Sequence, residues 1–105
     1  MELVNRRRRD GITVSLYDEG YYDGTRWHLR VRVHDRGVLV FDEPRFSPAP
    51  SIPWDSPRAV GEFLGFICNL DWADEEDMFT PEQRAWSRAH EEMLYTWAED
   101  LGADD

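Results

Sequence analysis

The chain has 105 residues and a formal net charge of −10, with 41% hydrophobic and 13% aromatic residues. This length predicts a single hydrophobic core, and the apolar content is too high for a disordered chain. The one cysteine, Cys68, excludes an internal disulfide and a cysteine-based zinc cluster. No segment is similar to a signal peptide or a membrane span, so we expect a cytoplasmic protein that does not contact membranes.

The negative charge is concentrated in the second part of the chain. Residues 1–45 contain nine Arg and eight acidic residues, whereas residues 46–105 contain three Arg and fourteen acidic residues. Lysine is absent, which excludes Schiff-base chemistry and the lysine of a phosphate loop. Because an acidic protein repels nucleic acid and attracts cationic surfaces, we expect a basic protein partner and no direct contact with nucleic acid. Adaptation to high salt is an alternative explanation of the acidity.

Residues 1–43 predict an antiparallel sheet of four strands. Residues 3–9 and 12–17 flank Asp10-Gly11, a dipeptide that favours a tight hairpin turn. Apolar and polar residues alternate from 26 to 34, which indicates a strand with one buried face, and an apolar run follows at residues 38–41. We expect residues 19–24 to form a loop between the second and third strands.

Two helices are predicted after the sheet. Residues 44–56 are rich in proline, which favours an extended segment that crosses the domain without pairing. Residues 57–70 and 80–101 then have apolar residues at helical spacing, and Thr80-Pro81-Glu82-Gln83 is a capping box at the start of the second helix. The predicted fold class is therefore α+β, with a four-stranded antiparallel β-meander followed by two α-helices packed on one face, in a single domain of residues 1–105.

The densest group of acidic residues lies in residues 71–79, the loop between the two predicted helices. A tryptophan beside carboxylates is typical of an interface anchor with a charged rim. Calcium binding is the weaker alternative, because the loop lacks the glycine and the late glutamate of a calcium-binding loop. Glu82, Glu92 and Glu99 are separated by nearly whole helical turns, which predicts one outward acidic sector. The predicted partner-binding residues are Asp71, Trp72, Asp74, Glu75, Glu76, Asp77, Glu91, Glu92, Glu99 and Asp100.

The histidines and serines do not indicate catalysis, and we expect no cofactor and no metal. His28 and His34 are six residues apart, about 20 Å along an extended strand, which is too far to ligate one metal ion. His90 lacks the second histidine of a zinc-protease helix, since Leu94 stands four residues later. We expect His90 to be a satisfied residue at the edge of the core. The chain also has no nucleophile elbow, so a protein that is not an enzyme is predicted.

The leading hypothesis is a non-catalytic inhibitor whose acidic surface imitates a phosphate backbone. Such a protein would occupy the cationic surface of a nucleic-acid-binding or nuclease component. In size and charge the chain is similar to small acidic inhibitors such as phage anti-defence proteins of the anti-CRISPR type, and to toxin-immunity proteins. The alternative is an immunity or adaptor protein that makes acidic protein–protein contacts without imitating nucleic acid.

The polar face of the sheet supports an opposing hypothesis. Arg30 and Arg32, with His28 and His34 and extended by Arg6 and Arg8, predict a basic strip near Tyr17. Arginine beside an aromatic ring is typical of surfaces that bind single-stranded nucleic acid, although the total charge of the chain argues against this. The same strip could instead contact the acidic face of a second copy in a homodimer.

Overall fold

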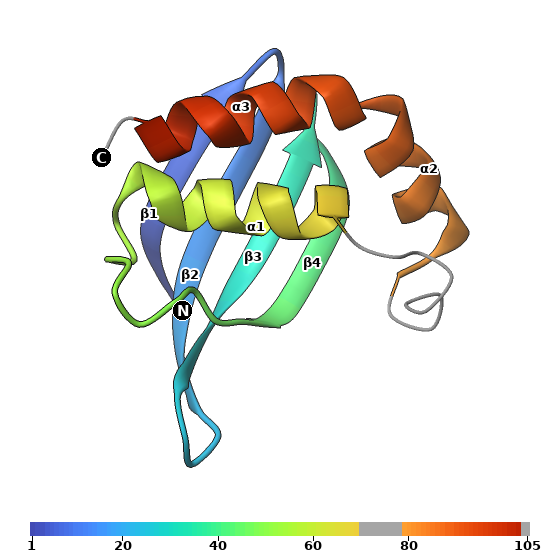
Figure 1. Ribbon diagram of the computed structural model, residues 1–105. Helices are drawn as coiled ribbons and strands as arrows, with labels where there is room; N and C mark the ends of the chain where they lie inside the picture. The colour runs from blue at the N-terminus through green and yellow to red at the C-terminus, as the bar shows by residue number, and fades with distance from the viewer. Residues whose placement is uncertain (70–78, 104–105) are drawn as a thin grey trace.

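The computed structural model describes residues 1–69 and 79–103, and its main feature is a four-stranded antiparallel sheet with the strand order β1-β2-β3-β4 (Figure 1). The strands are β1 (Glu2–Arg9), β2 (Ile12–Tyr22), β3 (Trp27–Asp35) and β4 (Val38–Phe46), and the helices are α1 (Pro57–Asn69), α2 (Pro81–Ala89) and α3 (Glu91–Ala103). Helices α1 and α3 lie side by side across one face of the sheet and run in opposite directions, while α2 lies beyond β4. The predicted α+β class and the β-meander are confirmed.

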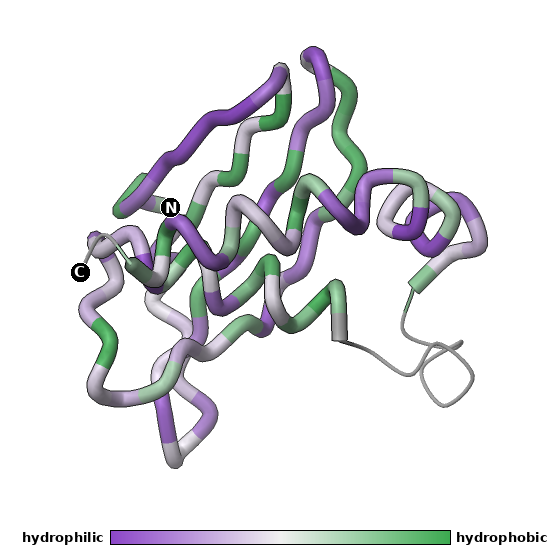
Figure 2. The backbone as a smooth tube through the Cα atoms, turned by 45° about the horizontal axis from the view of Figure 1, so that its top comes forward, coloured by the Kyte–Doolittle hydropathy of each residue, from purple (hydrophilic) through white to green (hydrophobic). Residues whose placement is uncertain are grey.

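The hydrophobic core lies between the sheet and helices α1 and α3. Along β2, hydrophobic residues alternate with more polar ones, as the tube in Figure 2 shows, so that one face of the strand is apolar. The apolar stripe predicted for the first helix is buried as a whole. The buried positions include Ile12, Val14, Leu16, Leu29, Val31, Val33, Phe41, Val60, Phe63, Leu64, Ile67, Cys68, Leu94, Trp97 and Leu101.

A buried asparagine joins β1 to the proline-rich segment. The side-chain nitrogen of Asn5 donates hydrogen bonds to the carbonyls of Trp54 and Ser56, at 3.0 and 2.8 Å. Its side-chain oxygen accepts a hydrogen bond from Arg7 Nε at 3.0 Å. Because these contacts link residues about fifty positions apart, they fix the path of the segment across the end of the sheet.

The four consecutive arginines of β1 are divided between the two faces of the sheet. Successive residues of a strand point to opposite sides. Arg7 and Arg9 are partly buried on the side of the helices, whereas Arg6 and Arg8 are exposed on the opposite side. The four identical residues therefore lie in two chemically different environments.

The second strand is longer than predicted. The sequence places residues 19–22 in a loop, but Tyr21 pairs with His28 and Tyr22 pairs with Trp27. Ring centroids in these two pairs lie 5.4 and 5.2 Å apart. Cross-strand aromatic pairs of this kind stabilise a two-stranded ribbon, so the hairpin extends beyond the rest of the sheet (Figure 1).

The fourth strand is also longer than predicted. β4 continues to Phe46 and includes Pro44, which the sequence places in the unpaired crossing segment. The register of β4 against β3 shifts between Leu29 and Val31, where Pro44 lies on the partner strand. An edge strand with a local irregularity tolerates proline because no second neighbour needs its missing N–H group.

The predicted helix over residues 80–101 is wrong in its continuity, because the chain breaks at His90 into α2 and α3. His90 has φ −111° and ψ 8°. Its Nδ1 atom lies 2.7 Å from the Trp86 carbonyl oxygen. The break allows Trp86 to pack edge-on against Phe41 of β4, with ring centroids 5.8 Å apart, while α3 crosses the sheet. The sheet is thus followed by three helices, and α3 ends two residues later than predicted.

The capping box predicted at the start of α2 is confirmed. The Thr80 hydroxyl oxygen accepts a hydrogen bond from the Gln83 backbone N–H at 3.1 Å, and the Gln83 side-chain oxygen accepts one from the Thr80 N–H at 2.9 Å. The side-chain nitrogen of Gln83 also donates to the Val40 carbonyl at 3.0 Å. One residue therefore caps α2 and ties it to β4.

Candidate functional site

The structure describes four of the ten predicted partner-binding residues. The residues that lie outside the described part of the chain are Asp71, Trp72, Asp74, Glu75, Glu76 and Asp77. The other four, Glu91, Glu92, Glu99 and Asp100, all belong to α3 and are all exposed. We call these four residues the acidic side of α3.

Buried side chains fix the direction in which the acidic side of α3 faces. Leu94, Trp97 and Leu101 lie in the core at intervals of three and four residues. Glu92 and Glu99 therefore point outward, and since they are seven residues apart, their separation along the axis is about 10 Å. No basic residue occurs in the sequence of α3, so its negative charges are not balanced within the helix.

Asp100 contributes less negative charge than the three glutamates. Arg9 of β1 forms a 2.7 Å ion pair with Asp100, and the Arg9 guanidinium lies 5.9 Å from the centroid of the Trp97 ring. The pair is partly exposed, so it stabilises the fold by at most about 1 kcal/mol. Its main effect is to leave the glutamates as the uncompensated charges of the acidic side of α3.

Glu82 does not share a helix face with these glutamates. The sequence spacing predicts Glu82, Glu92 and Glu99 in one outward sector of a continuous helix. This prediction is wrong, because Glu82 belongs to α2 and the chain changes direction at His90 (Figure 1). The acidic side of α3 is limited to one helix of 13 residues, about 20 Å in length.

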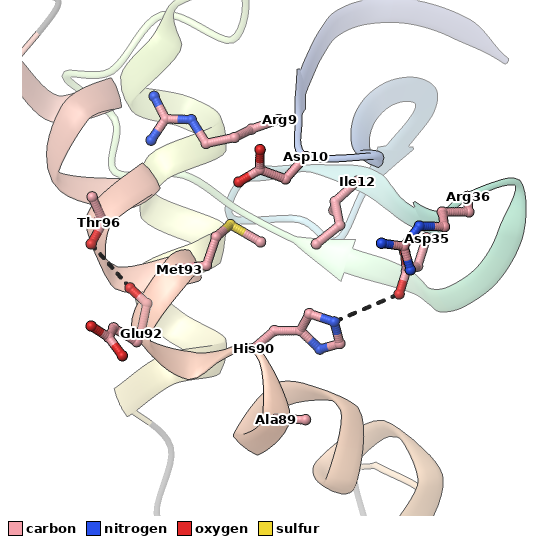
Figure 3. A pocket seen from close by; sticks show the side chains of 10 residues that line it. All are labelled: Arg9, Asp10, Ile12, Asp35, Arg36, Ala89, His90, Glu92, Met93 and Thr96. Atoms are coloured by element: carbon pink, nitrogen blue, oxygen red, sulfur yellow. Dashed lines mark hydrogen bonds and ion pairs between the residues drawn. The ribbon is translucent and has the colours of Figure 1, made fainter.

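A cavity of about 560 Å³ lies beside α3, next to the turns that join β1 to β2 and β3 to β4 (Figure 3). In Figure 3, Ile12 of β2 and Met93 of α3 point toward one another across the cavity, and Asp10 points into the same space. Glu92 is among the residues that line the cavity, but in Figure 3 its carboxylate points away from Ile12. The cavity therefore combines an apolar floor with charged residues at its rim.

Two tight turns with positive φ angles shape this rim. Asp10 and Gly11 have φ angles of 52° and 83°, and Arg36 and Gly37 have φ angles of 50° and 86°. These values are typical of two-residue hairpin turns, as predicted for Asp10-Gly11. The Arg36 N–H donates a hydrogen bond to the Gly11 carbonyl at 2.9 Å, so the two turns are held together.

Asp35 connects the end of β3 to the junction between α2 and α3. Its Oδ2 atom accepts a hydrogen bond from Trp86 Nε1 at 2.8 Å and lies 3.7 Å from His90 Nε2. The Trp86 and His90 rings stack with centroids 4.5 Å apart. His90 is thus a satisfied residue at the edge of the core, as predicted. The role of Asp35 was missed, because in the sequence it belongs to a turn and its partner is 51 residues away.

Replacing Asp35 is expected to weaken this junction. Asp35→Ala removes the acceptor of the partly buried Trp86 N–H, and an unsatisfied donor of this kind lowers the free energy of unfolding by about 1–3 kcal/mol. Urea unfolding followed by tryptophan fluorescence measures the change. Asp35→Asn keeps an oxygen acceptor and should recover most of the loss. Asp10→Asn is the control, because Asp10 is an exposed residue that lines the same cavity. If Asp35→Ala lowered the free energy of unfolding no more than Asp10→Asn, the role of Asp35 would be contradicted.

We call the face of the sheet opposite the helices the open face. The positive charge of its arginines is partly neutralised by carboxylates. Arg30 donates hydrogen bonds to Glu19 and, at 2.6 Å, to Asp42. The hydrogen bond to Glu19, followed by that to Asp42, raises the pKa of Arg30. Burial opposes ionisation of Asp42, but the hydrogen bonds and charges of Arg30 and Arg32 outweigh it and lower the pKa of Asp42. Arg30 is therefore largely compensated, although the predicted basic strip contains other arginines.

Comparison with protein-family models, with curated proteins and with solved structures finds no match for this chain. Within residues 1–69 and 79–103, no three side chains of His, Cys, Asp or Glu gather as a metal site requires. None of the described helices is long and apolar enough to span a membrane. The charges and the shape of the described residues are thus the basis for inferring function.

Proposed function

We propose that the protein is a non-catalytic, cytoplasmic inhibitor whose acidic side of α3 occupies a cationic nucleic-acid-binding surface of a basic partner protein. The observation that supports this proposal is the set of three exposed glutamates on a helix without basic residues, held in place by buried side chains of the same helix. A cationic groove attracts such a surface over a distance and selects it against neutral surfaces.

The spacing of the charges supports imitation of a phosphate backbone. Glu92 and Glu99 are about 10 Å apart along the axis of α3. That distance is close to the width of the major groove, about 12 Å, which separates two rows of phosphates. Tyr95 and Thr96 are exposed between the two glutamates and provide an uncharged contact surface. Because α3 is already folded, little conformational entropy is lost when it binds.

Neutralising the acidic side of α3 tests the proposal. Affinity purification from the host identifies the partner, and titration of the purified pair then gives the Kd at several salt concentrations. We expect Glu91→Gln, Glu92→Gln and Glu99→Gln in combination to raise the Kd at least about tenfold, since about 1.4 kcal/mol of binding free energy corresponds to one factor of ten. The dependence of the Kd on salt should also become weaker.

A control with the same change in net charge is Glu2→Gln, Asp55→Asn and Glu82→Gln, which are exposed positions outside α3. It should leave the Kd within about twofold, because these charges lie outside the helix that makes the proposed contact and salt screens exposed charges from one another. Equal losses in the two variants would show that total charge, and not α3, determines binding. Thermal unfolding of each variant verifies that it is folded.

The cavity beside α3 favours a second candidate, an immunity or adaptor protein that does not imitate nucleic acid. Ile12 and Met93 form an apolar recess that a side chain of a protein partner can enter, whereas imitation of phosphates does not require a recess. Competition with duplex DNA distinguishes the two functions. A partner saturated with duplex should no longer bind an imitator, but it should still bind an adaptor that uses another site.

A further inference from the structure

The open face of the sheet is positively charged, although the chain as a whole has a net charge of −10. Strand alternation and register place four arginines on this face, together with the two carboxylates that bind Arg30, which gives these six groups a net charge of +2. The arginines are Arg6, Arg8, Arg30 and Arg32, and the carboxylates are Glu19 and Asp42. The charge of the molecule is therefore separated between its two sides.

Arg6 is held in position by uncharged groups, whereas Arg32 contacts the Tyr17 ring and also forms an ion pair with Asp42. Arg6 donates from Nε to the Ser15 hydroxyl at 3.0 Å and from Nη2 to the Tyr17 hydroxyl at 3.3 Å. The Arg32 guanidinium lies 5.5 Å from the centroid of the Tyr17 ring, and its Nε is 3.4 Å from Asp42. Because these side chains are ordered in advance, an anion that binds them causes little further loss of entropy. The charge of Arg6 stays available to that anion.

The distance across the molecule limits the repulsion from the acidic side of α3. That helix lies on the other face of the sheet and is itself about 10 Å in diameter. Its outer carboxylates are therefore more than one Debye length, about 8 Å at physiological ionic strength, from the open face. Under these conditions an anion near the open face interacts mainly with the local arginines. At low salt the Debye length grows to about 30 Å and the repulsion returns.

We propose that the open face binds single-stranded nucleic acid, a function separate from that proposed for α3. Guanidinium groups bind phosphates in a bidentate manner and stack on bases, and an open four-stranded sheet suits an extended strand with exposed bases. Alternate residues of a strand are about 6.7 Å apart, so Arg6 and Arg8, and likewise Arg30 and Arg32, form repeating contacts along the face. This proposal reverses the expectation from total charge, because the relevant charge is local.

The test measures the fluorescence anisotropy of a short labelled oligo(dT) titrated with the full chain at physiological salt. Wild type is expected to bind with a Kd on the order of 10⁻⁵ M, in the range of non-specific nucleic-acid binding. Arg8→Gln with Arg32→Gln should raise the Kd at least about tenfold and reduce the salt slope by about 0.7 for each phosphate that the variant no longer neutralises. Arg58→Gln with Arg88→Gln changes the net charge equally but lies on the helices, and should leave the Kd within about twofold.

Three results would overturn the proposal. The first is no binding of oligo(dT) by wild type at any salt concentration. The second is an equal loss in the two arginine pairs, since total charge would then explain binding. The third is self-association of wild type, measured by sedimentation, that is lost in the Arg8→Gln, Arg32→Gln variant and kept in the Arg58→Gln, Arg88→Gln variant. A second copy of the chain would then cover the open face. The triple glutamine variant of α3 separates the two proposals, since it should keep oligo(dT) binding while losing the protein partner.

Discussion

Phe41→Ala is expected to lower the free energy of unfolding by about 3–5 kcal/mol, the range found when a fully buried phenylalanine is truncated. Phe41 is 1% exposed and makes edge-on ring contacts with Phe63, Phe79 and Trp86, with centroids 6.4, 5.6 and 5.8 Å away. It is the side chain through which β4 contacts α1 and α2 at once. Removal of the ring leaves a cavity and also removes aromatic interactions that area alone does not count.

Urea unfolding of Phe41→Ala and of Leu39→Ala provides the comparison. Leu39 is on the same strand but 49% exposed, so its truncation should change the free energy of unfolding by less than about 0.5 kcal/mol. If Phe41→Ala cost no more than Leu39→Ala, α2 would not be anchored through this ring. A far-UV circular dichroism spectrum at low temperature should retain both helix and sheet signals.

Gly61→Leu is expected to destabilise the fold by about 2–3 kcal/mol through overpacking. A Cβ atom at Gly61 would lie 3.2 Å from the Ala98 carbonyl oxygen and 3.2 Å from the Leu101 Cβ. Both neighbours belong to α3, so Gly61 lies at a close approach of the two helices that cover the sheet. A larger side chain forces α1 and α3 apart and exposes apolar surface of the core.

Gly65→Leu is the matched control, since Gly65 is on the same helix and a Cβ there meets no atom of the described residues within 4 Å. Leucine favours helix over glycine by up to about 1 kcal/mol, so this variant should unfold at the same or a higher temperature than wild type. The readout is the thermal midpoint of each variant. Similar midpoints for Gly61→Leu and wild type would show that the helices have room to separate.

Much of the fold follows from patterns that depend on neighbouring residues only. The alternation along β3, the apolar stripe of α1 and the capping box at Thr80 each report a local periodicity or a local hydrogen bond, and all three agree with the structure. The break at His90 does not follow from such patterns. Apolar spacing continues through it, and the chain bends because Trp86 of α2 packs on β4 while Trp97 of α3 is buried in the core.

The sequence predicted the negative charge of the candidate site, but only part of the arrangement of its residues. Glu91, Glu92 and Glu99 are exposed as expected, since helical spacing and charge both exclude them from the core. The compensation of Asp100 by Arg9 joins residues 91 positions apart, and no local pattern encodes such an ion pair. The cavity is likewise formed by separate turns and α3, so its position depends on how these elements pack.

Four consecutive arginines also leave the register of β1 against β2 ambiguous. A shift of one residue would exchange Arg6 and Arg8 with Arg7 and Arg9 and leave the sequence of the stretch unchanged, so the arginines themselves cannot select the correct alignment. Asn5 can, because only one position of β1 brings its amide to the carbonyls of Trp54 and Ser56. A single buried amide thus decides which arginines hold the fold together and which remain exposed to solvent.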